Sequence, residues 1–166
     1  MNILYCGDKP MQKGILLSSM SLIGNVEEPL NIYILTVDYS EKGVNYNPVD
    51  KAFAKYLERK LNKSDIGVNV FLVDVTRYFV EELPEANMQS RFTACCMLRL
   101  FADKTDIKER VLYLDTDVLC RKDFSDFYYQ NMDGIEIAGV SDYYGRWLFG
   151  DGYINSGVML MNMKAI

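Results

Sequence analysis

The amino-acid sequence predicts an α/β protein whose central, mostly parallel sheet is flanked by helices. Three largely apolar runs in the first half of the chain, over residues 3–6, 30–37 and 68–75, are typical of the strands of such a sheet. Stretches with helical periodicity separate these runs, and the resulting βαβαβ order favours parallel strands joined by right-handed crossovers. A fourth apolar run, residues 111–114, leads directly into Asp115 and Asp117. The chain of 166 residues shows no linker or internal repeat, so we expect a single domain over residues 1–166.

The first half of the chain begins with a strand. We expect this strand over residues 3–6, ending in a polar turn at Asp8. A helix follows over residues 11–23, where apolar residues recur at helical spacing until Gly24 closes it. The second strand is expected over residues 30–37. These elements form the first βαβ unit once the chain returns to the sheet.

The second unit is built in the same way. Pro48 suits the first turn of a helix, whose apolar face comprises Val49, Ala52, Phe53, Tyr56, Leu57 and Leu61. The third strand is expected over residues 68–75. A less regular stretch then leads to a mostly apolar helix over residues 89–102, which carries Arg99. A charged loop over residues 103–109 delivers the fourth strand.

The last part of the chain is less regular. One or two helical turns are expected over residues 124–129, and a short strand over residues 135–140. Residues 143–152 mix aromatic residues with glycines, which is typical of a loop. A final strand is expected over residues 158–161, and residues 162–164 look like the start of a further helix.

Composition and charge exclude several classes of function. The net charge is −5 and no run of Lys or Arg occurs, so we expect no nucleic-acid-binding surface. The chain contains no His, which excludes Ser/His and Cys/His catalysis and most zinc sites. No apolar stretch approaches the length of a membrane span, and the N-terminus lacks the features of a signal peptide.

The cysteines are Cys6, Cys95, Cys96 and Cys120, and no two of them have C-x-x-C spacing. This spacing indicates neither a zinc site nor a disulfide framework. Buried, reduced thiols are typical of the cytoplasm, so we expect a cytoplasmic protein.

Asp115 and Asp117 are the most informative polar residues. They lie one residue apart directly after a buried strand, and open α/β sheets bind ligands at the carboxyl ends of their strands. Two carboxylates this close repel each other unless a cation lies between them, and oxygen ligands favour Mg²⁺ or Mn²⁺. An ordinary strand-end turn, in which both side chains bond backbone amides, is the alternative.

Other polar residues are expected near the same edge of the sheet. Asp8 follows the first strand and would either accept a hydrogen bond from the N–H of a ligand ring or cap the following helix. Arg99 lies in an apolar helix and needs a partner, because an unpaired buried charge is costly. That partner is either a carboxylate of the chain or a diphosphate. Asp142 and Asn155 lie beside two further expected strands.

The sequence YLDTDVL at residues 113–119 resembles the DxD motif of family 8 glycosyltransferases. These are retaining, nucleotide-sugar-dependent enzymes of the GT-A fold, and they include bacterial lipopolysaccharide and lipooligosaccharide galactosyl- and glucosyltransferases. Four further segments resemble the family in the same order, namely residues 3–8, 99–100, 139–142 and 153–162. The resemblance extends over the whole chain and implies a GT-A, Rossmann-like fold.

The resemblance also implies roles for individual residues. Asp115 and Asp117 would hold Mn²⁺ or Mg²⁺ on the diphosphate of a UDP-sugar, and Asp8 would contact the uracil. The implied donor site comprises Tyr5, Cys6, Asp8, Arg99, Asp115, Thr116 and Asp117. Asp142 and Asn155 would hold the hydroxyls of the donor sugar and serve catalysis. The implied reaction transfers glucose or galactose from UDP-glucose or UDP-galactose to a saccharide acceptor, lipid-linked acceptors included.

The chain departs from the family pattern near its end. The third metal ligand of the family is a His from a late segment that also supplies a Gly and a Lys, and this chain ends before that segment. We therefore expect the N-terminal, nucleotide-binding portion of a C-terminally truncated glycosyltransferase. Association with a membrane through the missing part, and with further copies of the chain, is compatible with this hypothesis.

Two alternatives remain open. A truncated, non-catalytic module that binds a nucleotide or another partner would lack the same segment. A haloacid-dehalogenase-type phosphatase also carries Asp-x-Asp after an apolar strand, but it does so on its first strand and with a Lys well downstream.

Overall fold

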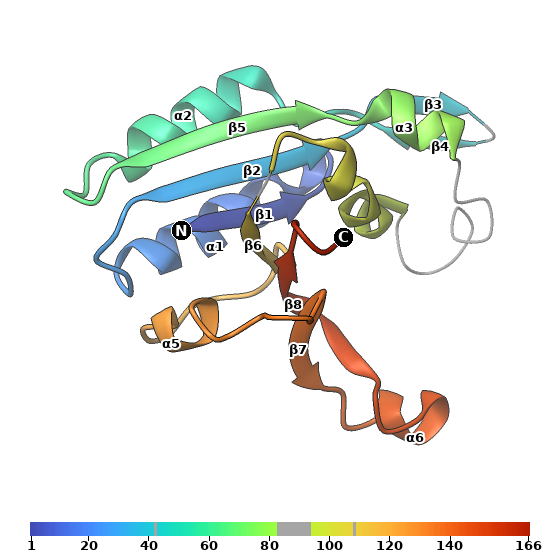
Figure 1. Ribbon diagram of the computed structural model, residues 1–166. Helices are drawn as coiled ribbons and strands as arrows, with labels where there is room; N and C mark the ends of the chain where they lie inside the picture. The colour runs from blue at the N-terminus through green and yellow to red at the C-terminus, as the bar shows by residue number, and fades with distance from the viewer. Residues whose placement is uncertain (42, 83–93, 108) are drawn as a thin grey trace.

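The computed structural model describes residues 1–41, 43–82, 94–107 and 109–166, and its central sheet carries helices on both faces (Figure 1). The strands of this sheet are β1 (Asn2–Cys6), β2 (Leu30–Thr36), β5 (Val68–Asp74), β6 (Arg110–Leu114), β7 (Ile137–Ser141) and β8 (Ile154–Asn162). A separate hairpin consists of β3 (Tyr39–Glu41) and β4 (Val44–Tyr46). The α-helices are α1 (Gln12–Ile23), α2 (Lys51–Leu61), α3 (Thr76–Glu81), α5 (Ser125–Tyr128) and α6 (Gly145–Phe149). The 3₁₀-helices are η1 (Lys9–Met11) and η2 (Ala94–Lys104).

The strands follow the order β5–β2–β1–β6–β8–β7 across the sheet. β5, β2, β1 and β6 are parallel, whereas β8 is antiparallel to both of its neighbours, β6 and β7. The predicted α/β class with a mostly parallel sheet is confirmed. Because β8 runs in the opposite direction, its first residues lie at the edge where β1 and β6 end. This reversal brings the start of β8 next to the Asp115–Asp117 turn.

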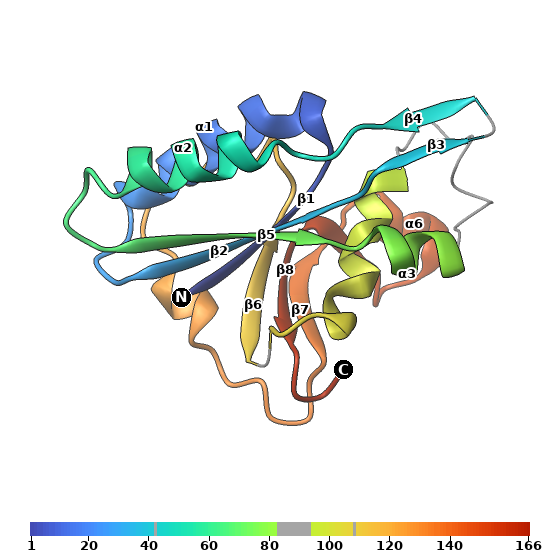
Figure 2. The same cartoon turned by 90° about the horizontal axis from the view of Figure 1, so that it is seen from above.

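Alternate residues of β1 and β6 face opposite layers, which explains why both strands are apolar after their first residues, Asn2 and Arg110. Ile3 and Leu112 belong to the core beneath α1 and α2, and Leu4 and Tyr113 belong to the core beneath α3 and η2. Figure 2 shows α1 and α2 above the sheet and α3 below it. Burying both faces of a parallel sheet leaves no position for polar alternation.

The outer strands of the sheet carry features that hinder further pairing. On β5, the side chain of Asn62 donates to the carbonyl of Val68 at 2.6 Å and accepts from its amide at 2.8 Å. On β7, the register against β8 shifts between Gly139 and Ser141. Satisfied edge groups and bulges both reduce the pairing of an edge strand with another chain.

The structure corrects several sequence predictions. The helix expected over residues 89–102 is the 3₁₀-helix η2 in its described part, and residues 89–93 lie outside the described ranges. Helical periodicity alone does not separate the two hydrogen-bonding patterns. The expected loop at residues 143–152 contains α6, and residues 163–165 form a turn instead of the expected helix. The β3–β4 hairpin and α3 were not predicted, since both are too short for a periodic signal.

Tyr5 lies wholly buried at the centre of the core under α1. Its phenolic oxygen donates a hydrogen bond to Ser18 Oγ at 2.8 Å. Burial raises the pKa of Tyr5 from 10.0 to about 12. The unfolded chain therefore releases this proton at a lower pH than the folded chain does.

We expect this difference to lower the free energy of unfolding between pH 10 and pH 12, because the unfolded state alone loses the proton there. Between pH 10 and pH 12, the free energy of unfolding of the Tyr5→Phe variant should fall by about 2–3 kcal/mol less than that of the wild type. Urea unfolding at a series of alkaline pH values measures the effect. Tyr56→Phe, at an exposed position of α2, is the control and should follow the wild type. Equal pH dependence of Tyr5→Phe and the wild type would contradict the prediction.

Candidate functional site

The predicted site residues gather at the edge of the sheet where β1 and β6 end. Asp8 follows β1, and Asp115 follows β6 directly. The amide of Asp115 donates to the carbonyl of Gly157 at 2.8 Å, which continues the β6–β8 ladder by one residue. Asn155 and Ser156 at the start of β8 therefore lie beside the Asp-x-Asp turn. Three strands contribute side chains to one small region.

The Asp115 carboxylate is held in place through one of its oxygens. Tyr113 donates its hydroxyl hydrogen to Asp115 Oδ1 at 2.5 Å, and Arg99 Nη1 lies 3.9 Å from the same oxygen. Burial raises the pKa of Tyr113 far above its ordinary value, so the hydroxyl stays protonated as a donor. The Asp115 side chain is 42% exposed, which leaves the rest of the carboxylate accessible to a ligand.

Arg99 links η2 to the ends of two strands. Its Nη1 donates to the carbonyl of Ser156 at 2.6 Å, and its guanidinium lies 4.7 Å from the centroid of the Tyr113 ring. The side chain is only 14% exposed. Of the two partners expected for Arg99, the structure shows the one within the chain: the Asp115 carboxylate, with the Ser156 carbonyl in addition.

Asp117 lies on the solvent side of the turn. The amide of Val118 donates to the carbonyl of Asp115 at 3.1 Å, which closes the turn around Thr116. The Asp117 side chain is exposed. Within the described residues no protein group bonds its carboxylate, so the alternative in which both Asp side chains bond backbone amides is not what the structure shows.

Asp142 and Asn155 bond each other and the neighbouring backbone. Asp142 Oδ1 accepts from the amides of Tyr144 at 3.0 Å and Gly145 at 2.6 Å, at the start of α6. Asn155 Nδ2 donates to Asp142 Oδ2 at 3.4 Å, and Asn155 Oδ1 accepts from the amide of Gly157 at 2.9 Å. The pair thus connects α6 to the strand that borders Asp115.

Asp8 is 8% exposed, and its Oδ1 has no hydrogen-bond partner among the described residues. Asp8 occupies the N-cap position of η1, but its side chain makes no capping bond there, so the side-chain cap that was the alternative is not what the structure shows. Burial raises the pKa of the Asp8 carboxyl. A buried acceptor without a partner is costly, and a ligand donor would remove that cost.

The other predicted contacts on β1 point into the core. The Tyr5 side chain faces α1, and Cys6 is buried in the opposite core layer. Only their backbone groups remain for contact with a ligand. Burial also raises the pKa of the Cys6 thiol, which keeps it protonated and unreactive.

The carboxylates of Asp115 and Asp117 are the candidate ligands for a cation at this edge of the sheet. Among the described residues, no group of three or more His, Cys, Asp or Glu side chains gathers around one point. Asp115 and Asp117 supply two hard oxygen donors, and Mg²⁺ keeps several waters or phosphate oxygens in its coordination shell. The residues therefore fit a cation that is held jointly with a diphosphate.

Comparison with known proteins shows the family of this chain. Residues 2–166 match the family model of glycosyl transferase family 8. The chain belongs to glycosyltransferase family 8. It is 24% identical over 162 residues to the glycosyltransferase GlyA of Streptococcus pneumoniae serotype 4, and the match covers 98% of this chain and 22% of GlyA.

Solved glycosyltransferase structures share the fold. The galactosyltransferase LgtC, in complex with donor and acceptor sugar analogues, is 20% identical with a TM-score of 0.76, over 99% of this chain and 59% of that chain. The glycosyltransferase GlyE of Streptococcus pneumoniae TIGR4 is 21% identical with a TM-score of 0.68, over 98% of this chain and 34% of that chain. The GT-A fold predicted from the resemblance is therefore confirmed. The chain spans only part of each relative.

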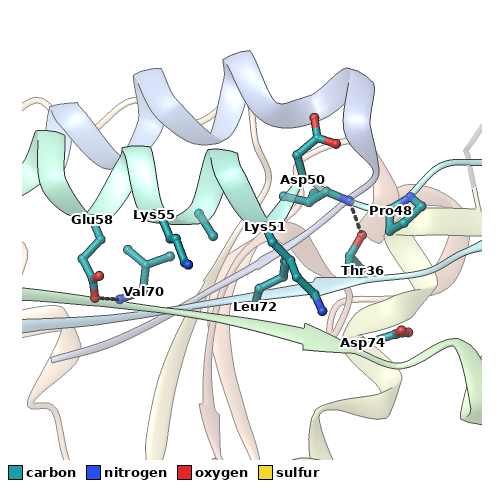
Figure 3. Close-up of a pocket in the computed structure, with 11 residues that line it drawn as sticks. Thr36, Pro48, Asp50, Lys51, Lys55, Glu58, Val70, Leu72 and Asp74 are labelled. Carbon is teal, nitrogen blue, oxygen red and sulfur yellow. Dashed lines mark hydrogen bonds between the residues drawn. The ribbon is translucent and has the colours of Figure 1, made fainter.

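A separate cleft of about 470 Å³ in this family 8 chain lies between α2 and β5 (Figure 3). Glu58 Oε1 accepts from the amide of Val70 at 3.1 Å, and Thr36 Oγ1 accepts from the amide of Val49 at 2.9 Å. These bonds fasten α2 to the edge of the sheet. None of the predicted site residues lines the cleft, so we assign it no part in the site.

Sequence reasoning missed the residues that support the two Asp side chains. The signal for Tyr113 is its position two residues before Asp115, which places both side chains on the same side of β6. The bond between Arg99 and Ser156 joins residues far apart in sequence and left no local signal.

Within the described residues, no helix has the length and apolar character that a membrane span requires.

Arg99→Met should lower the free energy of unfolding by about 2 kcal/mol, because a charge-assisted hydrogen bond and the contact with the Tyr113 ring are both lost. The amide of Asp115 should also exchange its hydrogen faster, since β8 loses its tie to η2. Urea unfolding and amide exchange measure the two effects. Arg77→Met is the control: Arg77 pairs with Glu81 on an exposed face of α3, where ion pairs contribute little. Equal effects of the two substitutions would contradict the assignment.

Proposed function

We propose that this chain forms the nucleotide-sugar-binding part of a retaining glycosyltransferase that moves glucose or galactose from a UDP-sugar to a saccharide acceptor. The observation that carries the proposal is the exposed turn with Asp115 and Asp117, which follows β6 at the edge of the sheet where open α/β sheets generally bind ligands, in a chain of family 8. The buried Oδ1 of Asp8, which has no hydrogen-bond partner in the part of the chain that the structure describes, supports a ligand with an N–H group.

The two Asp residues would hold Mn²⁺ or Mg²⁺ against the diphosphate. When bound, the cation supplies electrostatic stabilisation of the leaving diphosphate. Tyr113 and Arg99 fix the orientation of Asp115 through Oδ1, in the way that outer partners orient metal ligands. Asp117, which is exposed, completes the pair from the solvent side.

Asp8 would accept a hydrogen bond from the N–H of the uracil ring. Because its Oδ1 is buried, a base without that donor would leave the acceptor unpaired, and the resulting cost favours uracil over such a base. The backbone of Tyr5 and Cys6 would lie along the base, while their side chains stay in the core.

Asp142 and Asn155 would hold the hydroxyls of the donor sugar, and the acceptor would approach from the side of α6. The hydrogen bond between the pair fixes both side chains before a sugar arrives. The exposed aromatic rings of α6 and its flanks support a saccharide acceptor, because flat apolar rings can pack against the C–H face of a sugar. These residues are Tyr143, Tyr144, Trp147, Phe149 and Tyr153.

A cytoplasmic location belongs to the same proposal and is supported by the four cysteines, all of which are free. Association with a membrane surface or with a second copy stays a prediction.

A non-catalytic nucleotide-binding module is the second candidate function, and it is favoured by the presence of only two carboxylates at the turn among the described residues. A phosphatase of the haloacid-dehalogenase type is disfavoured because Asp115 follows β6 and not the first strand.

Calorimetric titration with UDP tests the proposal. UDP should bind more tightly in the presence of Mn²⁺, and Asp117→Asn should weaken Mn²⁺-dependent binding at least about tenfold, or 1.4 kcal/mol. Asp133→Asn makes the same change of charge at an exposed site far along the chain from the turn, and it should bind like the wild type.

The absence of any heat of binding for UDP with Mn²⁺ would refute the proposal. Metal-dependent hydrolysis of UDP-glucose or UDP-galactose would assign an enzyme, whereas UDP binding without any turnover would assign the non-catalytic module.

A further inference from the structure

Gly14 in the first turns of α1 lies directly against the Asp-x-Asp turn. A Cβ atom at this position would be 2.6 Å from the carbonyl oxygen of Thr116 and 3.1 Å from Thr116 Cβ. Real Cβ atoms essentially never come this close to another atom, so either α1 or the turn would have to move. The nearest atom belongs to the backbone, which no change of rotamer can displace.

Neither partner in this contact is free to shift. Ser18 and Leu22 of α1 are buried, and Ser18 accepts the hydrogen bond of Tyr5. The turn is fastened on its other side by the hydrogen bond from the Asp115 amide to the carbonyl of Gly157. A side chain at position 14 would therefore distort the turn between two fixed supports.

Gly157 forms the corresponding contact on the β8 side. A Cβ atom there would be 2.9 Å from Asp115 Oδ2 and 3.2 Å from Asn155 Oδ1. Tyr113 and Arg99 both approach the other oxygen of this carboxylate, Oδ1. A side chain at position 157 would push against the part of the carboxylate that is left for a ligand.

Gly14 is the third residue of α1. An isolated glycine inside a helical pattern usually has a packing or functional reason. Gly24, at the C-cap of the same helix, would meet nothing within 4 Å of an added Cβ. Of Gly14 and Gly24, only Gly14 therefore lies close to the Asp-x-Asp turn.

We propose that Gly14 and Gly157 are positioning residues that hold the Asp115–Asp117 turn from its two sides and so set the geometry of the two carboxylates toward a divalent cation. This inference rests on the proposed function of the turn. Ligand groups at such sites must be held within about 0.5 Å of the productive geometry. An added Cβ would lie less than 3.0 Å from its nearest atom at both glycines, so something must shift in each case, and the contact at position 14 is the closer one.

The test compares UDP affinity with and without Mn²⁺ in Gly14→Ala, Gly157→Ala and two control variants. The controls are Gly24→Ala on α1 and Gly152→Ala before β8, at which an added Cβ meets nothing within 4 Å. We expect the gain in affinity that Mn²⁺ gives to fall about 10–100-fold in Gly14→Ala and less in Gly157→Ala. Affinity for UDP without metal should stay that of the wild type, which a general loss of structure would not allow.

The outcomes separate this inference from the proposed function. If the wild type gains no affinity from Mn²⁺, the proposed function fails. If the wild type gains affinity and both glycine variants keep the full gain, the positioning role is refuted. Thermal unfolding of each variant checks the fold, and should Gly14→Ala not fold, Gly157→Ala decides, because its nearest contact is a side-chain oxygen and not the backbone.

Discussion

The candidate site depends on the insertion of β8, antiparallel, beside β6. The hydrogen bond from the Asp115 amide to the Gly157 carbonyl extends this pairing one residue past the end of β6, into the turn itself. The antiparallel direction of β8 places the first residues of this strand at the edge of the sheet where, in a fully parallel sheet, the strand would end. Asn155, Ser156 and Gly157 reach Asp115 for this reason, and Arg99 then fastens the same region from η2.

Support of the two carboxylates is unequal. Asp115 is oriented by Tyr113 and approached by Arg99, whereas Asp117 is exposed and has no bond to the protein among the described residues. One rigid and one adaptable carboxylate suit a cation that arrives together with its ligand, because part of the coordination shell is fixed in advance and part can adjust. The arginine balances the charge of the rigid member and is largely shielded from water.

The sequence was sufficient to predict the features that depend on local pattern. The strands β1, β2, β5 and β6, the helices α1 and α2, and the position of Asp115 at a strand end follow from periodicity and from the βαβαβ order. The antiparallel direction of β8 does not follow from these signals, because a continuous apolar run reads the same in both directions. The η2 helix, α6 and the β3–β4 hairpin were missed or misassigned since short segments carry little periodic signal. The Arg99–Ser156 bond and the contact of Gly14 with Thr116 arise only from tertiary packing.

The two outer strands of the sheet have a consequence for assembly. Asn62 satisfies the backbone of Val68 on β5, and the register shift at Gly139 distorts β7. Copies of this chain are therefore poorly suited to joining their sheets into one continuous ribbon. Any self-association would rely on side-chain surfaces, so it would be sensitive to single surface substitutions and would leave the backbone ladder of each copy intact.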